Sequence, residues 1–391
     1  MKYYLIAGEA SGDLHGSNLM KGLYANDPQA QMRFWGGPLM NEVFRAHEKG
    51  EGLVADYRDT AVMGVIQVVL QGKQLIDRIE RCKSDIGQWK PDVVILIDYP
   101  GFNFRIAEYA HEDGFRVYYY IAPKVWASRE GRIKKLKAWV DKLFIVFPFE
   151  KEYFTRHGVP YIYAGNPLVD AIEESPALQE TKEAFLERTG LPDRPWIALL
   201  AGSRNMEIRT MMPVYMQMAD AWHATHPDHL FVVAAAPSRS LKDYAPYMGS
   251  RDYVKLVFGE TYGTLRHARA AVINSGTASL EAALIGTPQV VGYKLSSLIP
   301  AWVAHKFLKV KYISLGNLIL DRLAFREFIQ SELTADALLQ ELTRLMEDEA
   351  YREKMKADYA QIRELLGGRG ASDAVAKAMI KDLFASLPQN V

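Results

Sequence analysis

Short apolar runs alternate along the chain with longer segments in which apolar residues recur at helical spacing. Runs of about four to eight residues favour buried parallel strands, and each ends at a turn rich in glycine, proline or aspartate. In the first half of the chain, strands are predicted at 3–8, 92–100, 117–123 and 142–149. In the second half, they are predicted at 196–204, 229–237, 253–259, 268–276 and 288–293. This alternation predicts an α/β fold with parallel, doubly wound sheets.

A polar, proline-bearing stretch at 173–182, EESPALQETK, separates the two series of strands. The pattern therefore predicts two Rossmann-like doubly wound parallel-sheet domains, residues 1–172 and 173–350, that face a cleft. Residues 351–391 carry a charged helical pattern. We expect these C-terminal helices either to pack on the first domain or to be exchanged between the copies of a dimer.

Composition narrows the function classes. Lysine plus arginine equals aspartate plus glutamate, at 47 each, so no overall field attracts nucleic acid. Cys82 is the one cysteine and the nine histidines are scattered, so neither an internal disulfide nor a zinc site is expected. No apolar run approaches the roughly 20 residues that a membrane-spanning helix needs. The sequence predicts no metal and no cofactor.

A run of small residues lies between a predicted strand and a predicted helix in INSGTASLEAALIG, residues 273–286. The first amides of a helix lack intrahelical acceptors and the helix dipole is positive there, so a phosphate or diphosphate can bind without a lysine. Glu281, just inside the helix, can accept hydrogen bonds from two sugar hydroxyls. The alternative is that Ser275 or Thr277 only caps the helix.

A glycine-rich turn follows the first predicted strand in GEASGDLHGS, residues 8–17. Gly8, Gly12 and Gly16 recur every four residues, which is neither the dinucleotide-binding spacing nor a phosphate loop. The glycines either let a ligand approach the backbone or let a helix pack closely on the sheet. The polar residues of this turn are Glu9, Ser11, Asp13 and His15.

Asp98 closes a strongly apolar predicted strand. Ligands of open parallel sheets collect beyond the carboxyl ends of the strands, so a carboxylate there can take a proton from an attacking hydroxyl. The alternative is that Asp98 caps the turn made by Pro100 and Gly101.

Two further candidates lie in the second half. Ser203 and Arg204 follow the strand at 196–204, where the guanidinium can offset charge on a departing diphosphate. Asn317 lies in a predicted loop, where an amide can orient a hydroxyl or a phosphate. Arg204 can also be an ordinary solvated loop residue, and Asn317 can simply shape a turn.

In this order, the stretches resemble the lipid-A-disaccharide synthase family, which comprises inverting glycosyltransferases (family 19) with the two-domain GT-B architecture. The likeness covers most of the chain, from near Met1 to about Ile329. Its matching pieces are AGEASGD, KPDVVILIDYPGFN, APKVWA, FPFEKEYF, LLAGSR, SGTASLEAALIGTPQVVGYK and YISLGNLI. Ala201, Asn205, Lys124 and Ser128 depart from the residues usual at these places, which bears on acceptor and acyl-chain preference.

The resemblance implies transfer of the sugar of UDP-2,3-diacylglucosamine to 2,3-diacylglucosamine 1-phosphate, giving a β-1,6-linked disaccharide and UDP. It implies Asp98 as the catalytic base and no metal. Acceptor binding is expected at Ser11, Gly12 and Asp13. UDP binding is expected at Ser203, Arg204, Asn274, Ser275, Gly276, Thr277, Ala278, Ser279, Glu281 and Asn317.

Acylated substrates imply a peripheral enzyme at the cytoplasmic face of the inner membrane, whose lipids would be partners. Apolar residues mix with lysines at 61–79 and 299–313, and a basic run lies at 129–139. Such stretches suit an interfacial surface, although core packing and a solvated basic face are the alternatives.

Three other functions are compatible with parts of the pattern. A UDP-sugar 2-epimerase has the same two-domain layout but needs no acyl-binding surface. A nicotinamide-dependent oxidoreductase would need a dinucleotide-binding glycine motif, which is absent from both halves. A non-catalytic nucleotide-sugar binding protein would not need Asp98 or Arg204.

Overall fold

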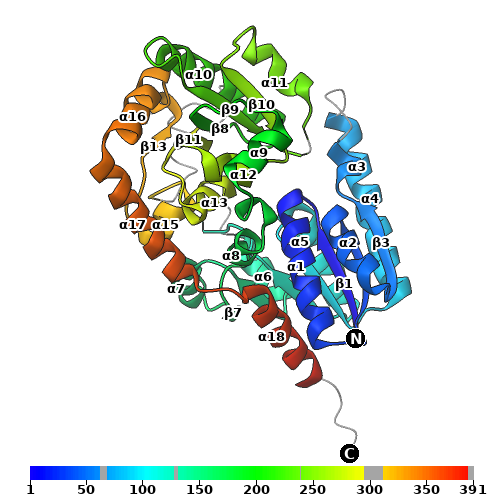
Figure 1. Cartoon of the computed structure of the whole chain (residues 1–391). Coiled ribbons are helices and arrows are strands. Elements are labelled where there is room, and N and C mark those ends of the chain that lie inside the picture. The colour runs from blue at the N-terminus through cyan, green and yellow to red at the C-terminus, as the bar shows by residue number, and fades with distance from the viewer. Residues whose placement is uncertain (62–67, 127–130, 238, 295–310, 386–391) are drawn as a thin grey trace, which may run out of the picture. The chain divides into compact units, whose positions relative to one another are not determined.

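The computed structural model describes residues 1–61, 68–126, 131–237, 239–294 and 311–385 (Figure 1). The chain divides into two compact units. The first comprises Met1–Ala171 together with Leu366–Val391, and the second comprises Ile172–Leu365. Residues 351–365 therefore belong to the second unit, whereas only the segment from Leu366 onward belongs to the first.

The first unit contains a parallel sheet in the order β3-β2-β1-β4-β5-β6-β7. Its strands are β1 (Lys2–Ala7), β2 (Gln31–Gly36), β3 (Gly50–Asp56), β4 (Val93–Ile97), β5 (Val117–Tyr120), β6 (Lys142–Ile145) and β7 (Tyr161–Tyr163). Leu5 of β1 lies opposite Phe34 of β2 on one side and Ile95 of β4 on the other. The central strands are buried on both faces, which explains their continuous apolar sequences.

Helices cover both faces of this sheet. They are α1 (Ala10–Asn26), α2 (Pro38–His47), α3 (Arg58–Ala61), α4 (Val68–Trp89), α5 (Pro100–Glu112), α6 (Arg132–Trp139), α7 (Pro148–Arg156), α8 (Pro167–Glu173) and α18 (Ala371–Ala385). On one face, Tyr4 and Leu96 pack with Ile86 of α4 and Ile106 of α5. Cys82 of α4 is buried in the same cluster, and this burial raises the pKa of its thiol.

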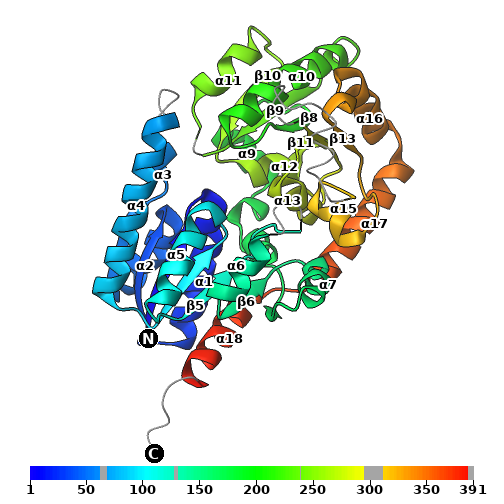
Figure 2. The same cartoon turned by 180° about the vertical axis from the view of Figure 1, so that it is seen from behind.

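Helix α18 packs on α1 of the same chain (Figures 1 and 2). The approach is close at Gly22, where a Cβ atom would lie 3.0 Å from Cβ of Ala376. Asn26 donates a hydrogen bond to Asp373 at 2.6 Å. The buried carboxylate of Asp170 accepts the amides of Gly370 at 2.6 Å and Ser372 at 2.9 Å, which fixes the start of α18. Within this chain, α18 therefore packs on the first unit.

The second unit contains a parallel sheet in the order β10-β9-β8-β11-β12-β13. Its strands are β8 (Trp196–Leu200), β9 (Leu230–Ala235), β10 (Val254–Phe258), β11 (Ala270–Asn274), β12 (Gln289–Tyr293) and β13 (Glu327–Ile329). Its helices are α9 (Lys182–Thr189), α10 (Asn205–His223), α11 (Leu241–Met248), α12 (Thr261–His267), α13 (Thr277–Ile285), α15 (Leu315–Leu320), α16 (Ala335–Glu347) and α17 (Glu349–Leu366), with short 3-10 turns at Pro176–Leu178 and Gln330–Glu332.

The predicted α/β class and both doubly wound parallel sheets are confirmed. All nine predicted strands are present, but four strands are additional. β7 and β13 have three residues each, too few to show a pattern. β2 is interrupted by Arg33, and β3 by the two left-handed residues Gly50 and Gly52. These four strands, of which β3, β7 and β13 are edge strands, therefore lack the continuous apolar run that marks the central ones.

The link between Asp170 and α18 gives a stability prediction. Asp170→Ala leaves the buried amide of Ser372 without an acceptor, so we expect a loss of about 1–3 kcal/mol in the free energy of unfolding of the first unit. Amide hydrogen exchange of α18 should accelerate in parallel. Glu80→Ala, which removes an exposed ion pair with Lys83, is the control and should cost about 0.5 kcal/mol or less. Unchanged exchange in α18 of the Asp170 variant would contradict this explanation.

Candidate active site

Each sheet reverses its strand order at one point. In the second unit the reversal lies between β8 and β11, which pair in parallel with Leu200 opposite Ile273. Such a reversal separates the turns that leave the two strands and opens a crevice where ligands of doubly wound sheets bind. The turn from Ala201 to Arg204 and the turn from Ser275 to Gly276 therefore lie next to each other.

Gly202 shows how closely these two turns approach. Its φ of 104° is in the left-handed region. A Cβ atom there would lie 2.3 Å from Oε2 of Glu207 and 2.8 Å from Nδ2 of Asn274. Both the conformation and the contacts require glycine, so the Gly-Ser-Arg sequence has a steric basis.

The N-terminus of α13 has no side-chain cap. Gly276 occupies the N-cap position, and among the residues that the structure describes no side-chain oxygen accepts from the first turn. Ser279, which could have served the turn, instead donates its hydroxyl to the carbonyl of Gly276 at 2.9 Å. A Cβ atom at Gly276 would meet nothing within 4 Å. Neither Ser275 nor Thr277 therefore caps this helix in the structure. The positive end of the helix is accessible to an anion.

The N-terminus of α10 is different. Oε2 of Glu207 accepts the amides of Ser203 at 2.9 Å and Arg204 at 3.1 Å. These amides are consequently occupied, and only the side chains of Ser203 and Arg204 face solvent. The Arg204 side chain is 66% exposed and its guanidinium lies 3.4 Å from Glu207. Glu207 was not predicted, although a glutamate three residues into a helix is a capping-box signal.

Glu281 follows on the next turn of α13 and is half-buried. Desolvation raises the pKa of its carboxyl to about 7, opposed by a hydrogen bond at 3.2 Å from the hydroxyl of Tyr262. Tyr262, in α12, orients the carboxylate and was not predicted. Nothing in its local sequence distinguishes it, because the contact depends on α12 and α13 being neighbours.

Asn317 occupies a different environment from the one expected of a ligand contact. It is fully buried in α15, where its amide donates to the carbonyl of Phe325 at 3.0 Å and to Glu327 at 2.7 Å. Its oxygen accepts the amide of Ala324 at 2.8 Å. The side chain thus holds the segment that leads to β13. The structure therefore shows a positioning role for the Asn317 side chain, and its contact with UDP stays a prediction.

In the first unit, the reversal lies between β1 and β4, and Asp98 follows β4 directly. Asp98 and Tyr99 have φ values of 43° and 47°, both left-handed. The turn is held by its carbonyl groups, since that of Asp98 accepts from the Tyr119 hydroxyl at 2.6 Å and from Asn103 at 2.8 Å. Two consecutive non-glycine residues in this region are strained, and such strain concentrates at functional sites.

The glycines of the first turn have separate explanations. A Cβ atom at Gly8 would lie 2.3 Å from the ring of Tyr99, so Gly8 makes room for the strained turn. A Cβ atom at Gly12 would be 3.2 Å from Cβ of Ala7, and one at Gly16 would be 2.7 Å from the sulfur of Met40. Gly12 and Gly16 therefore serve close packing of α1, which was the second of the two alternatives.

The three residues expected at the acceptor differ in accessibility. Ser11 is exposed, whereas Gly12 and Asp13 are buried. Asp13 accepts the amides of Gly37 at 2.8 Å, Leu39 at 3.0 Å and Met40 at 3.1 Å, and so fixes the start of α2. Burial raises its pKa, while these hydrogen bonds oppose the rise. Asp13 thus acts within the fold, and Ser11 is the residue of the three that is open to a ligand.

Glu150 is a buried carboxylate that the sequence did not single out. It lies in α7, after β6, and accepts from Nε1 of Trp126 at 3.1 Å and from the amide of Phe147 at 3.0 Å. Burial raises its pKa to about 7, opposed by the backbone hydrogen bonds. This contact anchors the APKVWA segment at the carboxyl end of the sheet. Across the described residues, no cluster of three metal-ligating side chains is present.

The two doubly wound parallel sheets give the chain the GT-B fold of glycosyltransferases and sugar epimerases. A UDP-GlcNAc 2-epimerase from Neisseria meningitidis matches with a TM-score of 0.71 at 15% identity, covering 97% of this chain and 100% of that one. At that identity the likeness is one of fold alone.

Sequence relatives define the family. A family model described as lipid-A-disaccharide synthetase matches residues 3–380. The lipid-A-disaccharide synthase of Geobacter metallireducens is 35% identical over 381 residues, covering 97% of this chain and 96% of that one. That of Myxococcus xanthus is 36% identical over 379 residues, covering 96% of each chain. The chain belongs to the lipid-A-disaccharide synthase family and is a glycosyltransferase.

The contact between Gly8 and Tyr99 can be tested by a paired substitution. Gly8→Ala places a methyl group on the Tyr99 ring and should displace the turn that carries Asp98, so we expect turnover to fall about tenfold or more with the fold retained. Gly8→Ala with Tyr99→Ala removes the clash and should recover part of the loss. Circular dichroism and steady-state kinetics of both variants check this. If Gly8→Ala alone keeps wild-type turnover, the steric explanation fails.

Proposed function

We propose that this enzyme transfers 2,3-diacylglucosamine from UDP-2,3-diacylglucosamine to 2,3-diacylglucosamine 1-phosphate with inversion. The products are the β-1,6-linked disaccharide 1-phosphate and UDP. Membership of the family supports lipid A precursors as substrates. The observation that carries the donor half of the proposal is the N-terminus of α13, which has no side-chain cap.

In this proposal the UDP diphosphate lies on the first amides of α13, beside Asn274, Ser275, Gly276, Thr277, Ala278 and Ser279. The exposed guanidinium of Arg204, with the hydroxyl of Ser203, adds a positive charge and a donor near the turn. These groups stabilise the negative charge that develops on the diphosphate as it leaves. Glu281 accepts hydrogen bonds from the ribose hydroxyls, and Tyr262 keeps its carboxylate in place.

The acceptor half assigns Asp98 as general base. The 6-hydroxyl oxygen of the acceptor attacks the anomeric carbon from the face opposite UDP, and the bond from that carbon to the diphosphate oxygen breaks. The hydroxyl proton passes to the Asp98 carboxylate. One displacement converts the α-linked donor to a β-linked product. The turn supports this role because hydrogen bonds from Tyr119 and Asn103 to the Asp98 carbonyl hold its backbone at the end of β4.

The substrates carry acyl chains, so the proposal places the enzyme peripherally at the cytoplasmic face of the inner membrane. Among the described residues, no helix combines the length and apolarity that crossing a bilayer requires. In the basic stretch at 129–139, Lys134, Lys135 and Lys137 of α6 are exposed, as an anionic lipid surface would need. The stretch at 61–79 continues from Val68 into α4, where Ile79 is buried and Ile76 is exposed. Residues 62–67, and residues 299–310 of the stretch at 299–313, lie outside the described residues.

A two-substrate assay tests the reaction and the base together. UDP release should require both UDP-2,3-diacylglucosamine and 2,3-diacylglucosamine 1-phosphate, whereas an epimerase would not need the second.

Asp98→Asn should lower kcat by about 10²–10⁴, because the general base is lost. Asp92→Asn, at the exposed start of the same strand, is the matched control and should keep wild-type turnover. Near-normal turnover of a folded Asp98→Asn variant would remove Asp98 from the mechanism.

Glu281 predicts a pH dependence of UDP affinity. Because its pKa is about 7, the carboxylate is ionised above that pH and becomes protonated below it. Protonation replaces one acceptor site by a donor, so UDP affinity should fall as pH drops through about 7. Glu281→Gln should bind UDP about tenfold or more weakly at pH 8, since a charge-assisted hydrogen bond is lost.

Calorimetric titration of UDP between pH 6 and 8.5 checks this. The phosphate of UDP titrates equally with both proteins, so the difference between wild type and variant isolates Glu281. A Glu281→Gln protein whose affinity keeps the pH slope of the wild type would show that the ribose contact lies elsewhere.

A further inference from the structure

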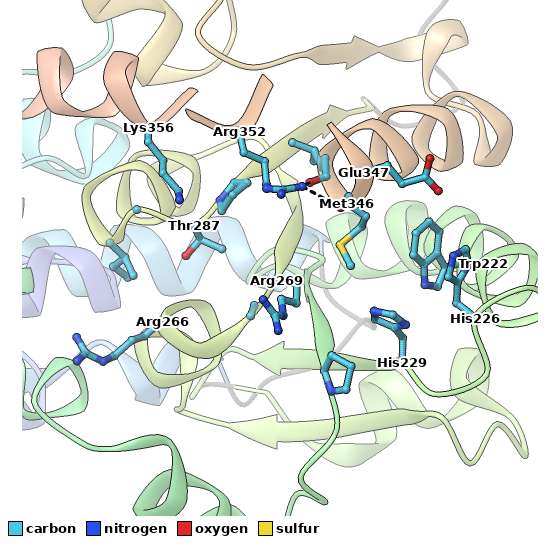
Figure 3. A pocket seen from close by; sticks show the side chains of 16 residues that line it. Trp222, His226, His229, Arg266, Arg269, Thr287, Met346, Glu347, Arg352 and Lys356 are labelled. Carbon is cyan, nitrogen blue, oxygen red and sulfur yellow. Dashed lines mark hydrogen bonds between the residues drawn. The ribbon is translucent and has the colours of Figure 1, made fainter. Parts of the chain in front are cut away.

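A cavity of about 570 Å³ opens in the second unit at the amino ends of its strands (Figure 3). Pro195, Arg269 and Pro288, which precede β8, β11 and β12, line it. The turns considered above leave the carboxyl ends of the same strands. This cavity is therefore a separate site at the opposite edge of the same sheet, and its size is typical of small-ligand pockets.

The lining of this cavity is strongly basic. Its cationic side chains are Arg266, Arg269, Arg352 and Lys356, and Glu347 is its one carboxylate. Figure 3 shows Arg266 and Lys356 on one side of the view, and Trp222, His226 and His229 on the other. Arg269 lies between the two groups. The chain as a whole has no net charge, so this concentration of cations is a local feature.

Two of the cations already have structural partners. Arg352 donates to the carbonyls of Leu345 at 2.9 Å and Met346 at 2.8 Å, which caps the C-terminus of α16. Lys356 forms an exposed ion pair with Glu353 at 2.8 Å. These contacts explain their presence without a ligand, although both remain available to add positive charge.

Arg266 and Arg269 are different. Both are exposed, and neither side chain has a hydrogen bond or ion pair with any other residue that the structure describes. Arg266 lies in the last turn of α12, where a cation often satisfies free carbonyls. Here the carbonyl of Leu265 already accepts from the Thr287 hydroxyl at 2.8 Å. Helix capping therefore does not account for these two arginines.

A neutral donor adjoins the cations. Trp222 is 1% exposed, lines the cavity, and its ring stacks on His226 with centroids 3.9 Å apart. Within the described part of the chain, its indole N–H has no hydrogen-bond acceptor. A buried donor without a partner is costly. An oxygen-rich ligand in the cavity would meet two guanidinium groups that have no partner among the described residues.

We propose that this cavity is a second anion site, which binds a phosphate-bearing ligand through Arg266 and Arg269. The guanidinium forks match phosphate oxygens, and the face of Trp222 is covered by His226, so recognition rests on the phosphate rather than on a stacked base. The phosphate comes either from a small soluble molecule or from a lipid headgroup. The site is independent of the donor site proposed at α13, because it shares no residue with it.

The test titrates inorganic pyrophosphate into the full chain at low salt. We expect two binding events with wild type, one at each anion site. Arg266→Ala with Arg269→Ala should weaken one of them about tenfold or more, since two charge-assisted contacts are lost. Arg204→Ala should instead weaken the other event. Lys242→Ala with Lys381→Ala removes the same charge from exposed positions outside the cavity and should leave both events unchanged.

Vesicle binding identifies the source of the phosphate. If the Arg266/Arg269 double variant also loses binding to phosphatidylglycerol vesicles, relative to the lysine control, the site accepts a lipid headgroup. If vesicle binding is unchanged and only pyrophosphate affinity falls, the ligand is a small soluble phosphate. Wild-type pyrophosphate and vesicle binding by the double variant would overturn the proposal. That result would leave the donor site intact, because Arg204→Ala tests it separately.

Discussion

The parallel arrangement of both sheets is the constraint on which the site depends. Parallel strands bring the ends of β8 and β11 to one edge, and the reversal of strand order between them separates the helices that follow. The first amides of α13 are then presented at this edge without a side-chain cap. An anion there gains from several backbone dipoles that the fold has already oriented, so binding requires little further ordering.

The two helix starts beside the reversal are used differently. Glu207 neutralises the start of α10 from within the protein, whereas the start of α13 has no such internal anion. This asymmetry favours an anion at the start of α13 rather than at the start of α10, as the proposed donor site requires. Glu207 accepts the backbone amide of Arg204 and lies 3.4 Å from its guanidinium, while the Arg204 side chain is 66% exposed.

The central strands and the class of fold could be predicted from sequence because buried parallel strands are apolar throughout, as at Val93–Ile97. The turn before α13 could be predicted because a run of small residues between an apolar strand and a helix marks a helix N-terminus; phosphate binding at this turn stays a prediction. What could not be predicted depends on contacts between distant segments. The hydrogen bond from Tyr262 to Glu281 forms only when α12 and α13 pack together. The hydrogen bond from the Asn317 amide to Glu327 forms only when β13 lies beside α15.

The most direct measurement of the central claim is the response of backbone amides to UDP in ¹⁵N-labelled protein. The account predicts that the N–H signals of Thr277 and Ala278 move strongly on titration, because the diphosphate becomes their hydrogen-bond acceptor. The amide of Ala184 at the start of α9, which is capped by Thr181, should stay in place. Saturable UDP binding with unshifted Thr277 and Ala278 signals would contradict the account.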